Sequence, residues 1–517
     1  MKNIFLFALL FMSISNVYLQ PKIDWQKSYG GSNDDYPYFA SSDIITTDGG
    51  YFIGGITASS NGNVSGFHGV QDFWALRLNS SGNLQWQKAY GGSNDDYATA
   101  WIQTTDNGFL IVGGTNSDDG NVSGNHGGYD IWVTKLNSLG TLLWSKCFGG
   151  SDYDFAYCVA NTSDGGYIIA GKTWSTDGNV TGYKGNGDAW VLKISSAGSL
   201  LWQKTLGGSS EDNIWNIKQS GSGFIVAGTT SSKDGNLTNN KGNFDVWILS
   251  LNSTGTVEWS KNFGGSQNDY AYSCYPISDG SFIVAGETQS NNGDITGNKG
   301  GFDIWILKIN AQGTILWQKT LGGTEDDWAC SIRPLSDGGF VIGGSSKSNN
   351  GDFNGNHGDW DFLILKINAN GILQWQELLG STGDDEATIV QQTSDGGYIA
   401  CGYASASNGN VSSIAGKSDI WIVKLSSTSS PYVELNDDEL VLFPNPASQK
   451  LYLNLNNSAI DSQVKYQIYN SNSILINEGK ITTSTDLEIG IGGLIPGIYF
   501  LKIETGNNQT VREFIVN

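Results

Sequence analysis

One tryptophan recurs through most of this chain at an almost constant interval. The copies stand at Trp25, Trp86, Trp144, Trp202, Trp259, Trp317 and Trp375, in steps of 61, 58, 58, 57, 58 and 58 residues. A repeat of several tens of residues is the sequence mark of a solenoid or a propeller. The spacing therefore predicts seven copies of one structural unit. Chemistry must then be sought where the copies share polar residues or differ from one another.

A single repeat divides into four predicted strands. In the copy that begins near Asp96 these are residues 97–105, 109–116, 130–136 and 141–148. A tight turn at Asp106-Asn107 joins the first two, and other copies have Asp-Gly there, which is a strong hairpin signal. The last two are joined by a short turn that ends in Gly140, where a glycine accepts a positive φ.

Both faces of these strands are apolar, since Ile131, Trp132 and Val133 follow one another without a polar residue. Such a run predicts a sheet that is buried on both sides. Seven four-stranded sheets with no helical pattern between them predict an all-β fold, a seven-bladed β-propeller over residues 22–426. A parallel β-helix is the alternative, although its rungs are usually shorter.

The ends of the repeat region predict how the ring closes. The region begins with residues 23–29, which match a fourth strand, and ends with residues 419–425, which match a third strand. We therefore expect the N-terminal strand to complete blade seven, with Trp25 and Trp421 in the same blade.

Composition limits the class of ligand. The chain has 50 acidic residues against 28 basic residues and a pI near 4.4. Binding to a nucleic-acid backbone needs clustered Lys and Arg, so nucleic acid is excluded as a partner. Cations or neutral ligands such as glycans fit this charge better.

The five Cys residues have no repeated spacing and do not predict a disulfide framework, although a bridge between Cys147 and Cys158 stays open.

The first 20 residues predict a signal peptide. Lys2 precedes an apolar run over residues 4–14, and small and polar residues follow it. That run is too short to span a bilayer, and no later segment approaches the ~20 apolar residues of a transmembrane helix. We expect an exported protein without a transmembrane segment.

An aspartate recurs in all seven copies, in the loop that leads from the outer strand of one unit to the inner strand of the next. A ring of such carboxylates predicts a binding face for cations or a cationic ligand. The alternative is that each one accepts backbone N–H bonds within its own loop. The residues are Asp35, Asp96, Asp154, Asp212, Asp269, Asp327 and Asp385.

A second loop of ~14 residues combines Asp, Asn and Gly, which suits the oxygen-rich coordination of Ca²⁺. Turns bonded to their own backbone are the alternative. The candidate calcium ligands are Asp119, Asn121, Asp130, Asp177, Asn179 and Asp188.

The residues that catalysis needs are not assembled in an obvious way. The three histidines, His68, His126 and His357, occupy the same loop position in separate units, so they do not form one metal site or a catalytic triad. A pair of carboxylates for polysaccharide cleavage remains open, because acidic residues gather on one predicted face.

The third strand also carries a recurrent Trp, which suits either sugar stacking or packing between blades.

The composition changes after a polar linker at residues 427–439. Residues 440–517 contain short alternating segments that predict a small Ig-like β-sandwich. Pro444, Asn445 and Pro446, followed later by Gly497 and Tyr499 and a terminal apolar strand, resemble the type A C-terminal sorting domain of the type IX secretion system. This resemblance implies a secreted propeller protein of a Bacteroidetes-type bacterium.

The resemblance also implies passage through the periplasm to the cell surface or the medium, with the secretion machinery as partner. For the repeats we expect a non-catalytic binding or adhesion protein, acting as a monomer on a glycan or a surface protein. An extracellular polysaccharide hydrolase or lyase and a structural surface component are the alternatives. Near-identical units favour binding or structure, because one active site is expected to make one unit unlike the rest.

Overall fold

A computed structural model describes residues 20–38, 42–237, 240–427, 440–455, 464–470, 475–481, 487–505 and 508–517. The predicted signal peptide lies outside these ranges except for Gln20, and the predicted linker except for Ser427. The chain divides into two compact units, Met1–Ser426 and Ser427–Asn517. Within the described ranges, no helix has the length and the apolar character that crossing a membrane requires.

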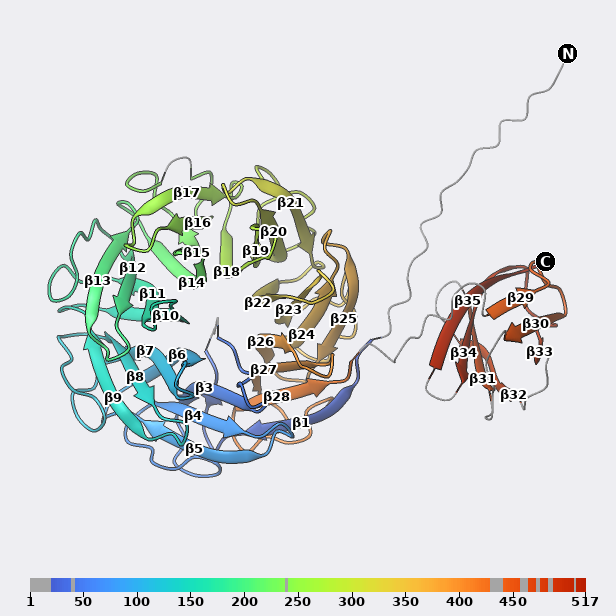
Figure 1. The fold of residues 1–517 in the computed structure, drawn as a ribbon, viewed down its shortest axis with the longest axis horizontal. Helices are drawn as coiled ribbons and strands as arrows, with labels where there is room; N and C mark the ends of the chain where they lie inside the picture. The colour runs from blue at the N-terminus through green and yellow to red at the C-terminus, as the bar shows by residue number, and fades with distance from the viewer. Residues whose placement is uncertain are drawn as a thin grey trace, which may run out of the picture. The chain divides into compact units, whose positions relative to one another are not determined.

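The described strands of the first unit form seven four-stranded antiparallel sheets around a common axis (Figure 1). Blade 1 contains β2 (Asp35–Tyr36), β3 (Tyr51–Thr57), β4 (Asp72–Leu78) and β5 (Leu84–Tyr90). Blade 2 contains β6 (Asp96–Gln103), β7 (Phe109–Thr115), β8 (Asp130–Leu136) and β9 (Leu142–Phe148). Blade 3 contains β10 (Asp154–Asn161), β11 (Tyr167–Thr173), β12 (Asp188–Ile194) and β13 (Leu200–Leu206).

The remaining blades repeat this order. Blade 4 contains β14 (Asp212–Ser220), β15 (Gly223–Thr230), β16 (Asp245–Leu251) and β17 (Val257–Phe263). Blade 5 contains β18 (Asp269–Pro276), β19 (Phe282–Thr288), β20 (Asp303–Ile309) and β21 (Ile315–Leu321). Blade 6 contains β22 (Asp327–Pro334), β23 (Phe340–Ser346), β24 (Asp361–Ile367) and β25 (Leu373–Leu379). The first strand of each blade lies nearest the axis, so the chain forms the seven-bladed propeller that the repeat predicts.

Blade 7 joins the two ends of the repeat region. Its strands are β26 (Asp385–Gln392), β27 (Tyr398–Ala404), β28 (Asp419–Leu425) and, at the outer edge, β1 (Ile23–Tyr29). Ser28 pairs with Trp421 in the antiparallel ladder between β1 and β28, and the Trp421 indole donates to Gln26 over 2.9 Å. Backbone pairing and a side-chain bond therefore close the ring without a covalent link.

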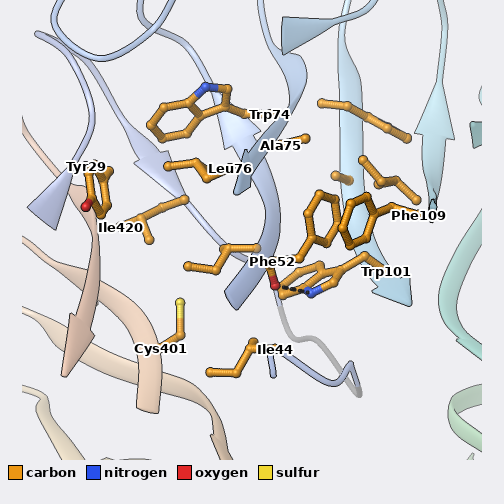
Figure 2. Close-up of a cluster of buried hydrophobic side chains, with 14 of the residues drawn as sticks. Tyr29, Ile44, Phe52, Trp74, Ala75, Leu76, Trp101, Phe109, Cys401 and Ile420 are labelled. Carbon is orange, nitrogen blue, oxygen red and sulfur yellow. Dashed lines mark hydrogen bonds between the residues drawn. The ribbon is translucent and has the colours of Figure 1, made fainter. Parts of the chain in front are cut away.

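The hydrophobic core lies between the blades. Figure 2 shows one part of it, where Phe52 of blade 1 stacks on Phe109 of blade 2 with ring centroids 3.8 Å apart, and the Trp101 indole donates to the Phe52 carbonyl. The recurrent third-strand tryptophans are fully or almost fully buried, which makes them packing residues and not sugar platforms. They are Trp74, Trp132, Trp190, Trp247, Trp305 and Trp421.

The second unit has two sheets in its described part. One consists of β29 (Leu440–Phe443), β30 (Lys450–Leu455) and β33 (Leu487–Gly490). The other consists of β32 (Leu475–Ile481), β31 (Val464–Asn470), β34 (Gly497–Thr505) and β35 (Asn508–Val516). Leu451, Ile468, Leu501 and Phe514 are fully buried between these strands. An all-β sandwich follows, and its assignment as Ig-like stays a prediction.

Candidate functional site

The seven recurrent inner-strand aspartates lie inside the protein. Each has no exposed surface. In blade 2, Asp96 accepts hydrogen bonds from the Gly92 backbone N–H over 2.8 Å, from Ser117 over 3.0 Å and from Thr115. Burial raises the pKa of Asp96 to about 6, against the lowering effect of these bonds. The carboxylate thus holds the loop between blades in place and does not face a ligand at the surface.

The other six copies are enclosed in the same way, so the predicted binding ring of carboxylates does not reach solvent. Asp35, Asp154, Asp212, Asp269, Asp327 and Asp385 each accept a backbone N–H four residues upstream and a serine hydroxyl. Backbone groups in a buried loop must be paired, and these side chains supply the partners. This is the structural role that the sequence left as the alternative.

The six candidate calcium ligands also bond to backbone N–H groups. Asp119 accepts from Ser93 over 2.6 Å and Asn121 from Gly91 over 3.2 Å, both in the loop that leads into the same blade. Asp177 and Asn179 repeat these two bonds in blade 3. Among the described residues, no group of three or more His, Cys, Asp and Glu side chains has an arrangement that could hold a metal ion.

The last two calcium candidates, Asp130 and Asp188, are fully buried at the start of the third strand. One oxygen of each accepts the backbone N–H four residues upstream, from His126 and Lys184. The other oxygen has no hydrogen-bond partner. For Asp130 this oxygen faces Gly149, where an added Cβ would lie 2.5 Å from it. A side chain at position 149 would collide with this oxygen, which explains why a glycine opens this loop.

The histidines stand apart, as their spacing predicts. His68, His126 and His357 each contact the third-strand aspartate of their own blade through Nδ1. In blades 3, 4 and 5 a lysine takes this position and reaches the next blade, as Lys241 does to Asp294 and Lys299 to Asp352. All five cysteines are free thiols, and four are buried.

The blades differ from one another at positions on and beside the inner strands. The second residue of the inner strand is Tyr36, Tyr97, Phe155, Asn213, Tyr270, Trp328 or Glu386. The fourth is Tyr38, Thr99, Tyr157, Trp215, Tyr272, Cys330 or Thr388. The penultimate residue of the second strand is Ile56, Gly114, Lys172, Thr229, Glu287, Ser345 or Tyr403. Near-identical blades thus carry a different set of side chains in each blade at these three positions.

Aromatic side chains from blades 2 and 3 form one half-buried cluster, which we call the aromatic platform. It consists of Tyr97, Tyr129, Tyr153, Phe155 and Trp174. Tyr97 and Tyr129 stack with centroids 5.4 Å apart, and Tyr129 lies 5.1 Å from Phe155. Tyr153 is 49% exposed, so part of the platform is accessible to solvent. Flat apolar faces with hydroxyl groups at their edges suit a ligand that is both apolar and polar.

A second set of rings runs from blade 3 to blade 5 along the inner strands, and we call it the aromatic row. Tyr157 stacks on Trp215 at 4.6 Å, Trp215 meets Tyr272 edge to face at 5.6 Å, and Tyr272 stacks on Tyr270 at 6.2 Å. Each of these rings is half-buried. Because the row links three inner strands, it follows the axis side of the propeller.

Ionisable groups lie next to these rings. Lys172 forms an ion pair with Glu211, and its ammonium lies 4.1 Å from the centre of the Trp174 ring. The Tyr272 hydroxyl donates to Glu287 over 2.8 Å. Burial raises the pKa of Glu287 to about 8, against the lowering effect of this bond. In the inner strand of blade 7, where Glu386 has Tyr403 as its hydrogen-bond partner, burial raises the pKa of Glu386 to about 7.

We call the aromatic platform, the aromatic row, Lys172, Glu287 and Glu386 together the axial site. Sequence reasoning did not identify it, because that reasoning followed the residues on which the copies agree. The signal was available in the sequence as the positions where the copies differ. Aromatic faces with a few convergent polar groups are the usual lining of a ligand site.

Of the proposed sorting residues, Gly497 and Tyr499 lie in β34 of the second unit's larger sheet, and Pro444, Asn445 and Pro446 follow β29 of the smaller sheet. The Asn445 side-chain oxygen accepts the Ile515 backbone N–H over 2.8 Å, and the Ala447 N–H donates to the Ile515 carbonyl. Tyr499, two residues after Gly497, donates its hydroxyl to the Ile495 carbonyl over 2.9 Å. The segment that contains Pro444 and Pro446 therefore holds the C-terminal strand.

Comparison with curated proteins finds one relative of limited extent. The regulatory protein FlaEY of Caulobacter vibrioides is 26% identical over 216 residues, which cover 37% of this chain and 22% of that protein. The chain therefore matches only about a fifth of the length of this relative.

Several solved structures are similar to this chain at low TM-scores. They include a DUF4221 family member from Bacteroides vulgatus, with a TM-score of 0.34 and 9% identity over 80% of this chain and 99% of that one. A Synechocystis apocarotenoid oxygenase mutant has 0.36 and 13%, over 80% and 95%. Drosophila Plexin A in complex with Semaphorin 1b has 0.37 and 9%, over 79% and 88%. These values transfer no chemistry to this chain.

Residues 441–517 match the family model of the secretion system C-terminal sorting domain. This match covers the second unit, whose strands and Asn445 contact are described above. The chain is thus a β-propeller repeat protein with a type IX C-terminal sorting domain, exported to the cell surface or the extracellular space.

Proposed function

We propose that the protein is an exported, non-catalytic binding propeller that holds a glycan at the axial site. The observation that carries this proposal is the difference among blades: a shared framework presents tyrosine, tryptophan, lysine and glutamate side chains where the inner strands meet. A sugar ring has apolar C–H faces and a rim of hydroxyl groups. Half-buried aromatic faces beside tyrosine hydroxyls and carboxyl groups complement both parts of such a ligand.

The charge of the protein supports the same ligand class. With 50 acidic and 28 basic residues, the surface repels polyanions such as nucleic acids at low salt. Aromatic stacking does not depend on net charge. A neutral glycan can therefore approach a site that a polyanion is kept away from.

A glycan array with the exported protein tests the proposal. Trp215→Ala removes the central ring of the aromatic row, and we expect it to lose binding to the glycans that the wild type retains. Leu201→Ala is the matched control, because Leu201 is 56% exposed on the outer strand of blade 3, away from the inner strands. Equal binding by the wild type and Trp215→Ala would place the ligand elsewhere.

A polysaccharide hydrolase is the second candidate, and Glu287 favours it. A carboxyl group with a pKa of about 8 is protonated at neutral pH and can act as a general acid. Glycoside cleavage also needs a second carboxyl group, for which Glu386 is the candidate. A reducing-end assay on the polysaccharides that bind, with Glu287→Gln as the variant, separates the two functions: release of ends by the wild type alone supports the hydrolase.

A further inference from the structure

A cleft of about 590 Å³ lies between blades 1 and 2, at the end of the ring where their tight hairpin turns stand, and we call it the junction cleft. Its volume is in the range of a small-molecule site. None of its lining residues belongs to the axial site. The lining includes Thr47, Arg77 and Trp86 of blade 1 and Gln103, Asn107 and Leu139 of blade 2.

Blade 2 departs from the repeat at two residues of this cleft. Leu139 is 70% exposed in the turn between β8 and β9, where the other blades with this turn have smaller or polar residues. Asn107 has a φ of +61°, a left-handed conformation that strains residues other than glycine and is typical of ligand sites when it occurs. Five other blades have a glycine at this position, namely Gly49, Gly165, Gly280, Gly338 and Gly396.

The matching cleft between blades 7 and 1 shows what the repeat alone provides. It has a volume of about 560 Å³, and its lining has Gly49 where the junction cleft has Asn107. The hollow thus follows from the packing of neighbouring blades. The Asn107 amide and the Leu139 side chain are specific to the junction of blades 1 and 2.

The charged side chains of the junction cleft are already paired. Arg77 donates through Nη1 to the Tyr51 carbonyl over 3.1 Å and through Nη2 to both carboxylate oxygens of Asp48. Arg77 and Asp48 carry the charges of the lining and neutralise each other. An ionic ligand would find no unpaired opposite charge among the lining residues, so a neutral ligand fits this cleft better.

Two amide side chains of the cleft keep donors for a ligand. Gln103 Oε1 accepts the Thr47 backbone N–H over 2.8 Å, and Asn107 Oδ1 accepts the Thr47 hydroxyl over 3.3 Å. These bonds hold both amides at the junction through their oxygens. Within the described part of the chain, no hydrogen bond uses Gln103 Nε2 or Asn107 Nδ2, so both nitrogens can donate to a ligand.

Apolar groups lie beside these donors. Trp86 is half-buried, and its Nε1 donates to the Ser138 carbonyl over 3.2 Å, so the indole spans the junction. Phe109 also lines the cleft and is held by its stacking on Phe52 (Figure 2). Together with Leu139, these rings give the cleft an apolar surface next to its amide groups.

We propose that the junction cleft binds one ring of a neutral saccharide. The amides of Gln103 and Asn107 donate to hydroxyl groups of the sugar, and its C–H groups pack against Trp86 and Leu139. This site is separate from the axial site, since Tyr97 and Gln103 are the second and the last residue of β6, roughly 20 Å apart along the strand. With the axial site proposed above, the propeller would hold two glycan chains at once.

Saturation-transfer NMR on the exported protein tests the proposal, with the methyl glycosides of glucose, galactose, mannose and N-acetylglucosamine as probes. The double variant Asn107→Gly/Leu139→Ser gives blade 2 the residues that blade 1 has at Gly49 and Ser81. Because glycine adopts the left-handed backbone without strain, this variant is expected to fold. Asn370→Gly is the matched control, because Asn370 is an exposed asparagine in the turn between β24 and β25 of blade 6.

We expect at least one probe to bind saturably to the wild type, to Asn370→Gly and to Trp215→Ala, which alters the axial site. Its dissociation constant should rise about tenfold in Asn107→Gly/Leu139→Ser, because a hydrogen bond and an apolar contact are lost. Binding that this double variant leaves unchanged would overturn the proposal, as would the absence of saturable binding of all probes. Binding that is lost in Trp215→Ala but kept in the double variant would also overturn it, while leaving the axial site as the place of the glycan.

Discussion

The indole ring of Trp202, in the outer strand of blade 3, lies on Gly255 in the turn between β16 and β17 of blade 4. A Cβ added to Gly255 would stand 2.7 Å from this ring. Five further pairs repeat the contact, so six of the seven ladder tryptophans each join one blade to the next. They are Trp25 with Gly82, Trp86 with Gly140, Trp144 with Gly198, Trp259 with Gly313 and Trp317 with Gly371.

Gly255→Ala tests this contact. The φ of Gly255 is +77°, so alanine pays for a left-handed backbone, about 1–2 kcal/mol, and for the clash with Trp202, about 1–3 kcal/mol more. Gly280→Ala is the matched control, because its φ is +81° and an added Cβ meets nothing within 4 Å. Chemical denaturation should show a larger loss of unfolding free energy for Gly255→Ala. Equal losses would mean that the tryptophan adjusts without cost.

Stability should rise as the pH falls from about 8 to about 5. Burial raises the pKa of Asp96, Asp154, Asp188 and Asp303 to about 6 and that of Glu287 to about 8. A folded-state pKa above the unfolded one means that the folded protein binds more protons in the interval between them. Lowering the pH through that interval therefore favours folding, and raising it removes this contribution.

Melting temperatures across this pH range measure the effect. Glu287→Gln keeps a partner for Tyr272 but cannot titrate, so the fall in melting temperature between pH 7 and pH 8.5 should become shallower. A wild-type melting temperature that increases from pH 5 to pH 8 would contradict the assignment of raised pKa values.

The Asp119 side chain is expected to stabilise its loop through the Ser93 N–H and not through calcium. Asp119→Ala should lower the unfolding free energy by about 0.5–1.5 kcal/mol, the usual contribution of a hydrogen bond. Asp119→Asn keeps an acceptor oxygen and should stay close to the wild type. Both variants are measured in excess calcium and in chelator. A calcium-dependent rise in the wild-type melting temperature that Asp119→Ala abolishes would establish a metal site instead.

Asn445→Ala should reduce export, because Asn445 holds the backbone of the C-terminal strand at Ile515. We expect the fraction of protein that reaches the surface or the medium of a secretion-competent host to fall several-fold, with periplasmic retention. Asn445→Asp preserves the acceptor oxygen and should be exported at a level closer to the wild type. Normal export of Asn445→Ala would show that this contact is dispensable for sorting.

Much of the fold could be predicted from the sequence, since Trp86, Trp144 and their equivalents mark blade edges and the strand limits follow from apolar runs. The location of the axial site could not be predicted in this way. Asp96 recurs because every blade needs the same loop, so its recurrence indicates a structural role and not a binding site. Trp215 and Glu287 have no equivalent in the other blades, so the repeat does not mark them. Only closure of the ring brings the inner strands of neighbouring blades, and with them these two side chains, close together.

The dissociation constant for the tightest glycan found on the array, measured for the wild type and Trp215→Ala, tests the central claim most directly. If the axial site holds the ligand, removal of this ring should weaken binding at least tenfold, while Leu201→Ala should bind like the wild type. An unchanged dissociation constant for a folded Trp215→Ala protein would contradict binding at the axial site.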